Sequence, residues 1–402
     1  MKDVIRDIRI RGAQHQPEWS DPLQLNRVAE ALAARPALVH PDDVATLRTL
    51  LGTVARGEAL VVQSGDCAED PQECGPYHVA RKVAVLDLLA GTLGLITGKP
   101  VLRVGRIAGQ YAKPRTSATE LVSGVELPSF RGHMVNSPEP DHESRRADPL
   151  RILTGYMAAS DVVDRLGWRE RGAGRDVVGP RVWTSHEALL LDYEVPMLRL
   201  DDDARLFLGS THWPWIGERT RQVDGAHVAM LSQVANPVAC KVGPAMEPDE
   251  LVALCERLDP WGDPGKLTLI ARMGADGVTR LLPRLVQAVR AAGHSAIWLT
   301  DPLHGNTVTA PSGVKTRLVD TVGLEVSRFV AAVRDAGGIP GGLHLETTPD
   351  DVAECAATET ELASVGERYT SFCDPRLTPT QAMSVVASWP AEPALTGQVP
   401  IP

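Results

Sequence analysis

The sequence has few of the features that mark secreted, membrane-bound or disulfide-rich proteins. Six cysteines in 402 residues are too few for a disulfide framework in a chain of this size. No uninterrupted apolar run is long enough to span a bilayer, and residues 1–7 have no apolar core of a signal peptide. We therefore expect a protein of the reducing cytoplasm without a membrane partner.

Clusters of positive charge are also missing. The formal net charge is −10, and no basic run is interleaved with aromatic residues, so we do not expect a nucleic acid as a partner. A mildly acidic surface mainly favours solubility. If the protein binds anions, the cations that hold them must be concentrated in a pocket.

Short apolar segments alternate with amphipathic helices from residue 59 onward, which predicts βα units and a parallel sheet. Eight strands are expected, at residues 59–62, 101–105, 181–184, 213–216, 238–242, 267–271, 296–299 and 343–345. Eight such units predict an α/β fold, a (β/α)₈ TIM barrel over residues 58–402. An open doubly wound sheet is the alternative, but no glycine fingerprint follows the first strand.

Two regions lie outside this rhythm. Residues 1–57 predict a peripheral N-terminal helical extension, with helices that begin near Asp21-Pro22 and His40-Pro41. Residues 107–149 are rich in Pro, Gly and Ser and show no obvious helix or strand. Because loops of this length are usually functional, we expect this one to lie over the barrel mouth.

Residues just past the carboxyl ends of barrel strands line the active site of such folds. One chemical set at these positions combines a thiol, an imidazole and two carboxylates: Cys67, His304, Glu346 and Asp374. This mixture suits Mn²⁺, Fe²⁺, Co²⁺ or Zn²⁺ and is too soft for Mg²⁺ or Ca²⁺. Each residue also has a plain structural explanation, for instance Cys67 as a buried core thiol. Their meeting at one end of one barrel favours a metal site.

A second set at the same end consists of cations: Arg106, Lys113, Arg115, Arg219, Lys241 and Arg272. Unpaired, they would repel one another strongly, so anionic ligands are expected among them. Guanidinium groups match phosphate and carboxylate oxygens, and so many cations indicate more than one anionic group. Lys113 and Arg115 could alternatively be solvated loop charges.

Several stretches, in order along the chain, carry a resemblance to a known family: residues 63–69, 104–115, 215–227, 236–244, 272–274, 304–306, 341–346 and 373–377. The chain resembles the class II 3-deoxy-D-arabino-heptulosonate 7-phosphate (DAHP) synthases, and among them the shorter members of secondary, phenazine-type metabolism. The resemblance implies a transferase that condenses phosphoenolpyruvate with erythrose 4-phosphate and releases phosphate. This reaction opens the shikimate pathway of aromatic amino acid biosynthesis.

The resemblance also implies roles for individual residues. The metal ligands would be Cys67, His304, Glu346 and Asp374, with Mn²⁺ or Co²⁺ preferred over Zn²⁺ or Fe²⁺. Phosphoenolpyruvate would be held by Arg106, Glu218, Arg219, Lys241 and Arg272, and erythrose 4-phosphate by Lys113, Arg115 and Thr116. We expect Cys67, Lys113 and Glu218 to act in catalysis, with Glu218 or a metal-bound water activating the water that adds to C2. A homodimer is expected.

The chain departs from the family pattern at two positions. Ser64 replaces a glycine, and Thr116 replaces a serine, which crowds the aldose site. The region between the second and third strands is short for members with an inserted helical pair, which predicts weak or no feedback control.

Three alternative functions stay open. They are an aminoDAHP synthase that uses an imino-erythrose 4-phosphate (aminoshikimate route), a barrel metallohydrolase that needs no phosphoenolpyruvate, and an inactive scaffold protein. Cys373 could also approach Cys67 and form a reversible disulfide.

Overall fold

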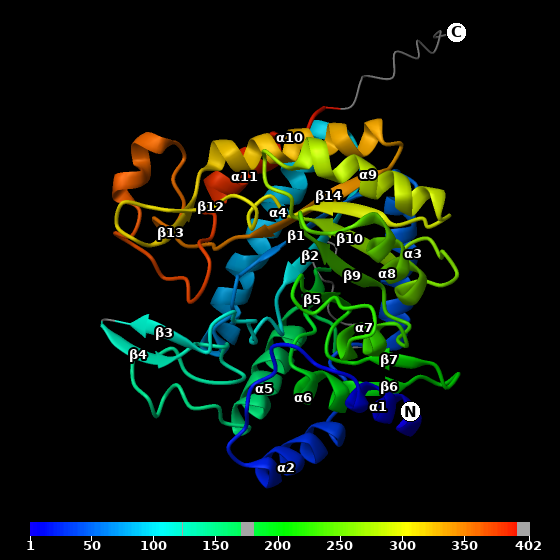
Figure 1. Cartoon of the computed structure of the whole chain (residues 1–402), viewed down its shortest axis with the longest axis vertical. Coiled ribbons are helices and arrows are strands. Elements are labelled where there is room, and N and C mark those ends of the chain that lie inside the picture. Colours follow the sequence, from blue (N-terminus) through cyan, green and yellow to red (C-terminus); the bar gives the residue numbers. More distant parts are fainter. Residues whose placement is uncertain (123, 170–180, 392–402) are drawn as a thin grey trace.

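The computed structural model describes residues 1–122, 124–169 and 181–391, and its centre is a closed barrel of eight parallel strands (Figure 1). Around the barrel the strands follow the order β1 (Leu60–Gly65), β14 (Pro340–Glu346), β11 (Ile297–Thr300), β10 (Leu267–Ala271), β9 (Val238–Val242), β8 (Trp213–Ile216), β5 (Trp183–Glu187) and β2 (Val101–Arg106). Each strand pairs in parallel with both neighbours. The predicted (β/α)₈ barrel is confirmed, and the open sheet is excluded because the sheet closes.

Helices pack around the barrel: α4 (Pro76–Thr97), α5 (Leu150–Arg165), α6 (Leu191–Glu194), α7 (Ala226–Leu231), α8 (Pro248–Leu258), α9 (Val278–Ala291), α10 (Val319–Asp335) and α11 (Pro379–Ala387). The longest, α4, begins with a proline at its first position and ends at Gly98, whose φ of 68° is left-handed. Both features are the ones that helix ends favour. The apolar face of α10, which includes Val322, Val326, Val330 and Val333, is buried, and α9 and α10 lie side by side at the top of Figure 1.

The described residues form three antiparallel hairpins outside the barrel: β3 (Thr119–Val122) with β4 (Val125–Pro128), β6 (Leu198–Leu200) with β7 (Leu206–Leu208), and β12 (Thr307–Thr309) with β13 (Lys315–Arg317). The expectation that residues 107–149 contain no strand is therefore wrong. The β3 and β4 strands pair only with each other, so they lack the continuous apolar run that marks a barrel strand. Short 3₁₀ segments occur at Pro71–Cys74, Val195–Met197 and Glu359–Ser364.

Three helices precede the barrel: α1 (Lys2–Ile10), α2 (Pro22–Ala33) and α3 (Pro41–Ala55). The Asp21 side chain accepts hydrogen bonds from the backbone N–H groups of Leu23 and Gln24, which satisfies two donors at the start of α2. Buried side chains of all three helices belong to the same hydrophobic cluster as the barrel. The division into an extension and a barrel at residues 57 and 58 stays a prediction.

The described helices include none with both the length and the apolar character needed to cross a membrane.

Candidate active site

The barrel mouth contains a cavity of about 510 Å³, walled by strand ends and by the β3–β4 and β12–β13 hairpins. All but one of the predicted site residues line it: Arg106, Lys113, Arg115, Thr116, Glu218, Arg219, Lys241, Arg272, His304, Glu346 and Asp374. The exception, Cys67, is 0% exposed and contacts Asp374 from behind the wall. The loop at residues 107–149 contributes several lining residues, so its predicted place over the mouth is confirmed.

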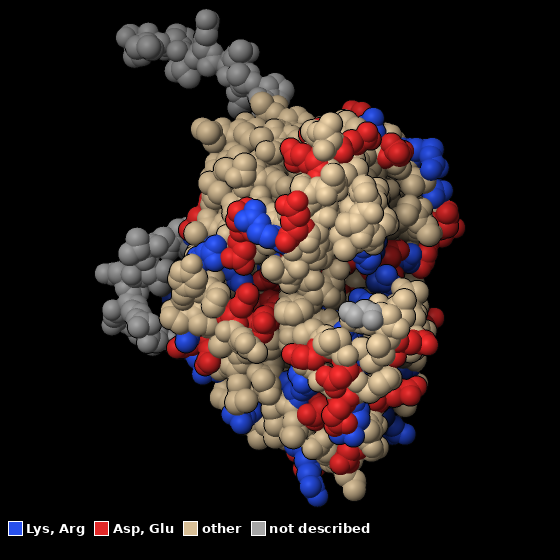
Figure 2. All heavy atoms as spheres, turned by 90° about the vertical axis from the view of Figure 1, so that its left-hand side faces the viewer, with Lys and Arg blue, Asp and Glu red and all other residues tan. Residues whose placement is uncertain are grey.

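Figure 2 shows the side of the molecule that carries both hairpins, where basic and acidic side chains are mixed. No single sign of charge dominates this face. The cations expected for anion binding line the cavity instead, where carboxylates lie among them.

Strand register places the central ion pair of the site. Gly65, at the end of β1, lies opposite Glu346 on one side and Arg106 on the other. A Cβ atom at Gly65 would lie 2.6 Å from the backbone oxygen of Arg106, so only glycine allows this close approach. Arg106 and Glu346 flank Gly65, and Arg106 Nη2 donates to Glu346 Oε1 at 3.0 Å. Segments 240 residues apart thus meet because β1, β2 and β14 end at the same height along the barrel.

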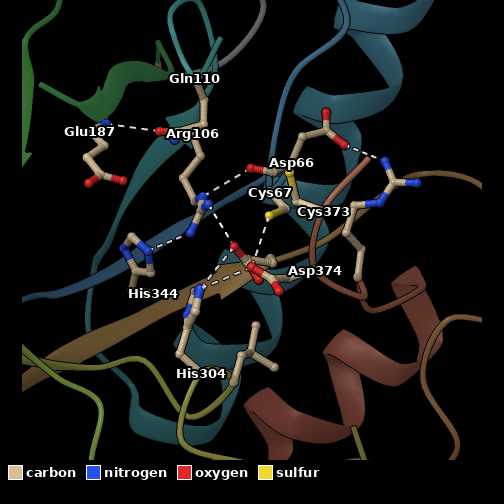
Figure 3. A network of polar contacts seen from close by, with 12 residues as sticks. Asp66, Cys67, Arg106, Gln110, Glu187, His304, His344, Cys373 and Asp374 are labelled. Atoms are coloured by element: carbon tan, nitrogen blue, oxygen red, sulfur yellow. Dashed lines mark hydrogen bonds and ion pairs between the residues drawn. The ribbon is translucent and has the colours of Figure 1, made fainter. Parts of the chain in front are cut away.

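An acidic and sulfur-containing cluster surrounds this pair (Figure 3). The candidate ligand atoms of Cys67, Glu346 and Asp374 all lie within 4.8 Å of one another. His304 Nε2 lies 3.5 Å from Glu346 Oε1 and 3.9 Å from Asp374 Oδ2. One thiol, one imidazole and two carboxylates at these separations fit a divalent transition-metal ion.

The two carboxylates are held in the ionised form that a cation requires. Burial would raise the pKa of Glu346, but nearby positive charges, foremost His304 and Arg106, outweigh it and hold that pKa well below its usual range. The pKa of Asp374 is also lowered, because His304 and Lys113 outweigh burial and the charge of Glu346. Both groups therefore carry negative charge at neutral pH.

A buried acid, Asp301, lies behind His304 and Lys241. Its Oδ2 atom accepts from His304 Nδ1 at 2.7 Å and from Lys241 Nζ at 2.5 Å. The first contact leaves Nε2 of His304 facing the cluster, the arrangement that metal-bound histidines usually have. Burial lowers the pKa of Lys241 to about 8, against the opposing charge of Asp301. The carboxylate of Asp301 thus orients both His304, from the predicted metal ligands, and Lys241, from the predicted anion-binding cations.

Cys67 is surrounded by groups that face the cavity. Its sulfur lies 3.7 Å from Asp374 Oδ2, and its carbonyl oxygen accepts from Lys113 Nζ at 3.0 Å. Contact with the Cys373 thiol, together with burial, raises the pKa of Cys67. Figure 3 shows the Cys67 and Cys373 side chains next to each other, so the approach of these two residues is confirmed. All six cysteines are free.

The cations of the cavity differ in how far they are neutralised. Arg106, Lys241 and Arg115 pair with Glu346, Asp301 and Glu120 respectively, so the chain itself supplies an anionic partner for these three. Within the described part of the chain, Arg219 and Arg272 take part in no ion pair, and Arg272 Nε is buried without a hydrogen-bond partner. These two guanidinium groups are best placed to receive an added anion.

Glu218 lines the cavity beside a cation that sequence reasoning did not select. Its Oε1 atom accepts from Arg221 Nη2 at 3.0 Å, and Arg221 also pairs with Glu250. Its Oε2 atom is buried without a hydrogen-bond partner in the described residues. One oxygen of Glu218 is thus fixed, and the other makes no hydrogen bond to the described residues.

Sequence reasoning missed several other residues of the site. Asp301 directly follows the seventh strand, so the rule that found the other strand-end residues could have found it. Arg317 pairs with Glu346 at 2.9 Å and Lys315 with Asp374 at 2.9 Å. Both belong to β13, a hairpin strand without a strand-end signal. His344, within β14, accepts from Arg106 Nη1 at 2.6 Å because burial holds its pKa well below the usual range and keeps it neutral.

The two departures from the family pattern are accommodated differently. Ser64 is buried, and its hydroxyl forms a 2.7 Å hydrogen bond with the hydroxyl of Thr347. Thr116 lies on the cavity wall, and its methyl group takes up more space than the hydrogen of a serine would.

Several known proteins are similar to this chain in sequence or in fold. A model of the Class-II DAHP synthetase family matches residues 4–177 and 170–388. A probable phospho-2-dehydro-3-deoxyheptonate aldolase of Pseudomonas fluorescens is 54% identical over 393 residues, which cover 98% of each chain. The phospho-2-dehydro-3-deoxyheptonate aldolase of Streptomyces coelicolor is 37% identical over 420 residues, covering 93% of each.

A solved phospho-2-dehydro-3-deoxyheptonate aldolase structure from Francisella tularensis has a TM-score of 0.54 and 14% identity, and covers 89% of this chain and 95% of that one. At this identity the likeness supports the barrel fold alone. The family match and the 54% identical relative span almost the whole chain. The chain therefore belongs to the class-II DAHP synthetase family, whose members condense phosphoenolpyruvate with erythrose 4-phosphate to form DAHP.

Proposed function

We propose that the cavity catalyses a metal-dependent condensation of phosphoenolpyruvate with erythrose 4-phosphate, the first step of the shikimate pathway. The observation that carries the proposal is the cluster of Cys67, Glu346 and Asp374, with His304 beside it, in and directly behind the wall of a cavity that several cations line. These four residues are the proposed metal ligands. Mn²⁺ or Co²⁺ is the proposed ion, with Zn²⁺ or Fe²⁺ as alternatives. A bound divalent ion would act as a Lewis acid on the aldehyde oxygen of the aldose.

The chain's own cations hold the phosphoenolpyruvate. Arg219 and Arg272 offer guanidinium forks to the phosphate, and Arg106 and Lys241 lie deeper among buried carboxylates. Holding the enol in one orientation turns a bimolecular reaction into a positioned one. Lys113, Arg115 and Thr116 would receive the erythrose 4-phosphate on the wall near the β3–β4 hairpin.

Glu218 is the proposed proton acceptor. Carbon–carbon bond formation leaves positive charge at C2 of the enol phosphate, and water adds there before phosphate leaves. The free Oε2 atom of Glu218 would accept the proton of that water, while Arg221 holds Oε1. Glu218→Gln should lower kcat by about 10²–10⁴-fold, with a smaller change in the Kd of phosphoenolpyruvate.

The deciding experiment measures phosphate release with phosphoenolpyruvate and erythrose 4-phosphate together, with each omitted, and with a chelator. We expect release only when both substrates and the metal are present. Release without phosphoenolpyruvate would instead indicate a metallohydrolase. Release only with the imino-erythrose 4-phosphate would indicate the aminoshikimate route. Full activity after complete removal of metal would contradict the proposed metal dependence.

We also propose that the enzyme serves secondary metabolism and is weakly regulated. The alignment with the Streptomyces coelicolor relative has 420 positions, more than the 402 residues of this chain, so that relative carries residues without a counterpart here. This supports a missing regulatory insertion. Turnover should stay unchanged with added Phe, Tyr and Trp, and strong inhibition by any one of them would count against the proposal.

We also propose that the protein forms a homodimer in the cytoplasm. Light scattering after size-exclusion chromatography should give twice the 43.2 kDa chain mass. Cell fractionation tests the location.

A further inference from the structure

Glu325, on α10, is a buried acid that the proposed mechanism does not use. Its side chain is 0% exposed, and its neighbours on the helix, Val322, Val326 and Phe329, are buried and apolar. None of the ion pairs in the described part of the chain includes it. Burial, together with the charge of Asp301, raises its pKa, and the hydrogen bonds that its oxygens accept oppose that rise. An apolar residue would avoid this cost, so the acid needs an explanation.

The carboxylate of Glu325 binds two loops at once. Its Oε1 atom accepts from the backbone N–H groups of Met273 at 3.2 Å and Gly274 at 3.0 Å. Its Oε2 atom accepts from Asn306 Nδ2 at 2.6 Å. The first two donors lie in the loop after β10, and the third lies in the loop after β11.

These two loops also touch each other directly. Gly274 has a φ of 78°, and a Cβ atom at Gly305 would lie 2.3 Å from the backbone nitrogen of Gly274. Asn306 joins the loops further, because its Oδ1 atom accepts from the N–H of Ala275 at 3.0 Å. The loops therefore form one backbone-to-backbone junction with Glu325 bonded to both sides.

Each loop carries a residue of the proposed site next to this junction. Arg272 directly precedes Met273, and His304 directly precedes Gly305. Both side chains line the cavity. We propose that Glu325 is a positioning residue that holds the substrate-binding loop of Arg272 and the metal-binding loop of His304 in one relative geometry. The inference rests on the roles proposed above for Arg272 and His304.

The contact pattern explains why this residue is an acid. All three partners of Glu325 donate, and a carboxylate is the side chain that offers acceptors only. The orientation of Asn306 is fixed, because Oδ1 faces the N–H of Ala275 and Nδ2 also donates to the carbonyl of Pro302 at 2.7 Å. A glutamine at position 325 would point its NH₂ group either at Asn306 Nδ2 or at the two backbone N–H groups. Either way, buried donors would face each other.

The test compares Glu325→Gln, Asn306→Asp and the double variant. In the double variant the amide introduced on α10 can donate to the carboxylate introduced in the loop after β11, which still accepts from the N–H of Ala275. Isothermal titration gives the Kd of Mn²⁺, and a second titration gives the Kd of phosphoenolpyruvate with the Mn²⁺-saturated protein. We expect each single variant to weaken both ligands by about tenfold or more. The double variant should recover part of both losses.

Val326→Ala is the matched control, since it opens a buried cavity on the same helix and removes no side-chain hydrogen bond to either loop. It should lower Tm and leave both Kd values unchanged. If the two single variants lower Tm as Val326→Ala does and leave both Kd values alone, Glu325 is merely structural and the inference is overturned. If Glu325→Gln does not fold, Asn306→Asp decides the question by the same two titrations.

Two further variants separate failure of this inference from failure of the proposed function. His304→Ala should lose Mn²⁺ binding, and Arg272→Ala should weaken phosphoenolpyruvate while it keeps Mn²⁺. If both behave so and the Glu325 and Asn306 variants bind normally, the inference alone is wrong. If His304→Ala binds Mn²⁺ like the unmodified protein, the proposed metal site fails first.

Discussion

Replacing Asp301 with asparagine tests the link between the two halves of the site. The Oδ2 atom of Asp301 accepts from His304 Nδ1 and Lys241 Nζ, and its Oδ1 atom accepts from the backbone N–H groups of Leu303 and His304. Asparagine has one acceptor oxygen. Its NH₂ group must therefore face either the two side chains or the two backbone donors.

The size of the effect follows from these contacts. Loss of an outer partner of a metal-bound histidine costs about 10–100-fold in metal affinity, or about 1.4–2.7 kcal/mol. Lys241 also loses the opposing charge that sustains its pKa near 8, so a larger neutral fraction is expected at slightly alkaline pH. Phosphoenolpyruvate should then bind more weakly, and more so as the pH rises.

Chelator competition would give the Mn²⁺ affinity of Asp301→Asn, and steady-state kinetics between about pH 6.5 and pH 9 would give kcat/KM for phosphoenolpyruvate across the titration of Lys241. Circular dichroism would check that the fold is retained. Asp335→Asn, on the last position of α10, is a control outside the cavity. A folded Asp301→Asn enzyme with unchanged Mn²⁺ affinity and an unchanged pH profile would refute this reasoning.

Four other outcomes are expected. Cys67→Ala should lose most bound metal and activity while it keeps its circular dichroism spectrum, and a fully active, metal-depleted variant would contradict the ligand assignment. Because Lys241 must be protonated to attract an anion, kcat/KM for phosphoenolpyruvate should fall as the pH rises through about 8. Lys241→Arg should move that fall to higher pH. If the fall stays at the same pH in Lys241→Arg, Lys241 is not its source. Asp66→Asn removes the buried negative charge that pairs with both Arg376 and Lys82 at 2.7 Å. Because Arg376 keeps its pair with Glu354, the free energy of unfolding, measured by urea denaturation, should fall by no more than about 3–5 kcal/mol; unaltered stability would show that these ion pairs contribute nothing net. Peroxide should remove the thiols of Cys67 and Cys373 together and release the metal, whereas a count of six free thiols after treatment would exclude the disulfide.

The barrel could be predicted because its strands are buried on both faces. Segments such as Val238–Val242, with every residue buried, must be apolar along most of their length, and this pattern is visible without any partner. The β3–β4 hairpin gave no such signal, since its strands are four residues long and mostly exposed or half-buried. Tertiary position, rather than local hydrophobicity, makes that hairpin part of the cavity wall.

The candidate site could be predicted only as a set of groups. The barrel rule places Arg106, Glu346 and His304 at one end because all barrel strands run the same way. It does not say which of them pair. The ion pairs of Lys241 with Asp301 and of Arg106 with Glu346 depend on strand register and on the length of the side chains.

The closed parallel fold and the reactive groups at its mouth follow from the order of residues alone, because hydrophobic patterns and strand direction are local properties of the chain. Three other features depend on how distant segments pack: Cys67 lies behind the cavity wall, Arg219 and Arg272 are free of ion pairs within the described residues, and Glu325 bonds to two loops of the site. Such contacts depend on distances between segments far apart in the chain. Close packing sets those distances, and no local pattern of residues encodes them.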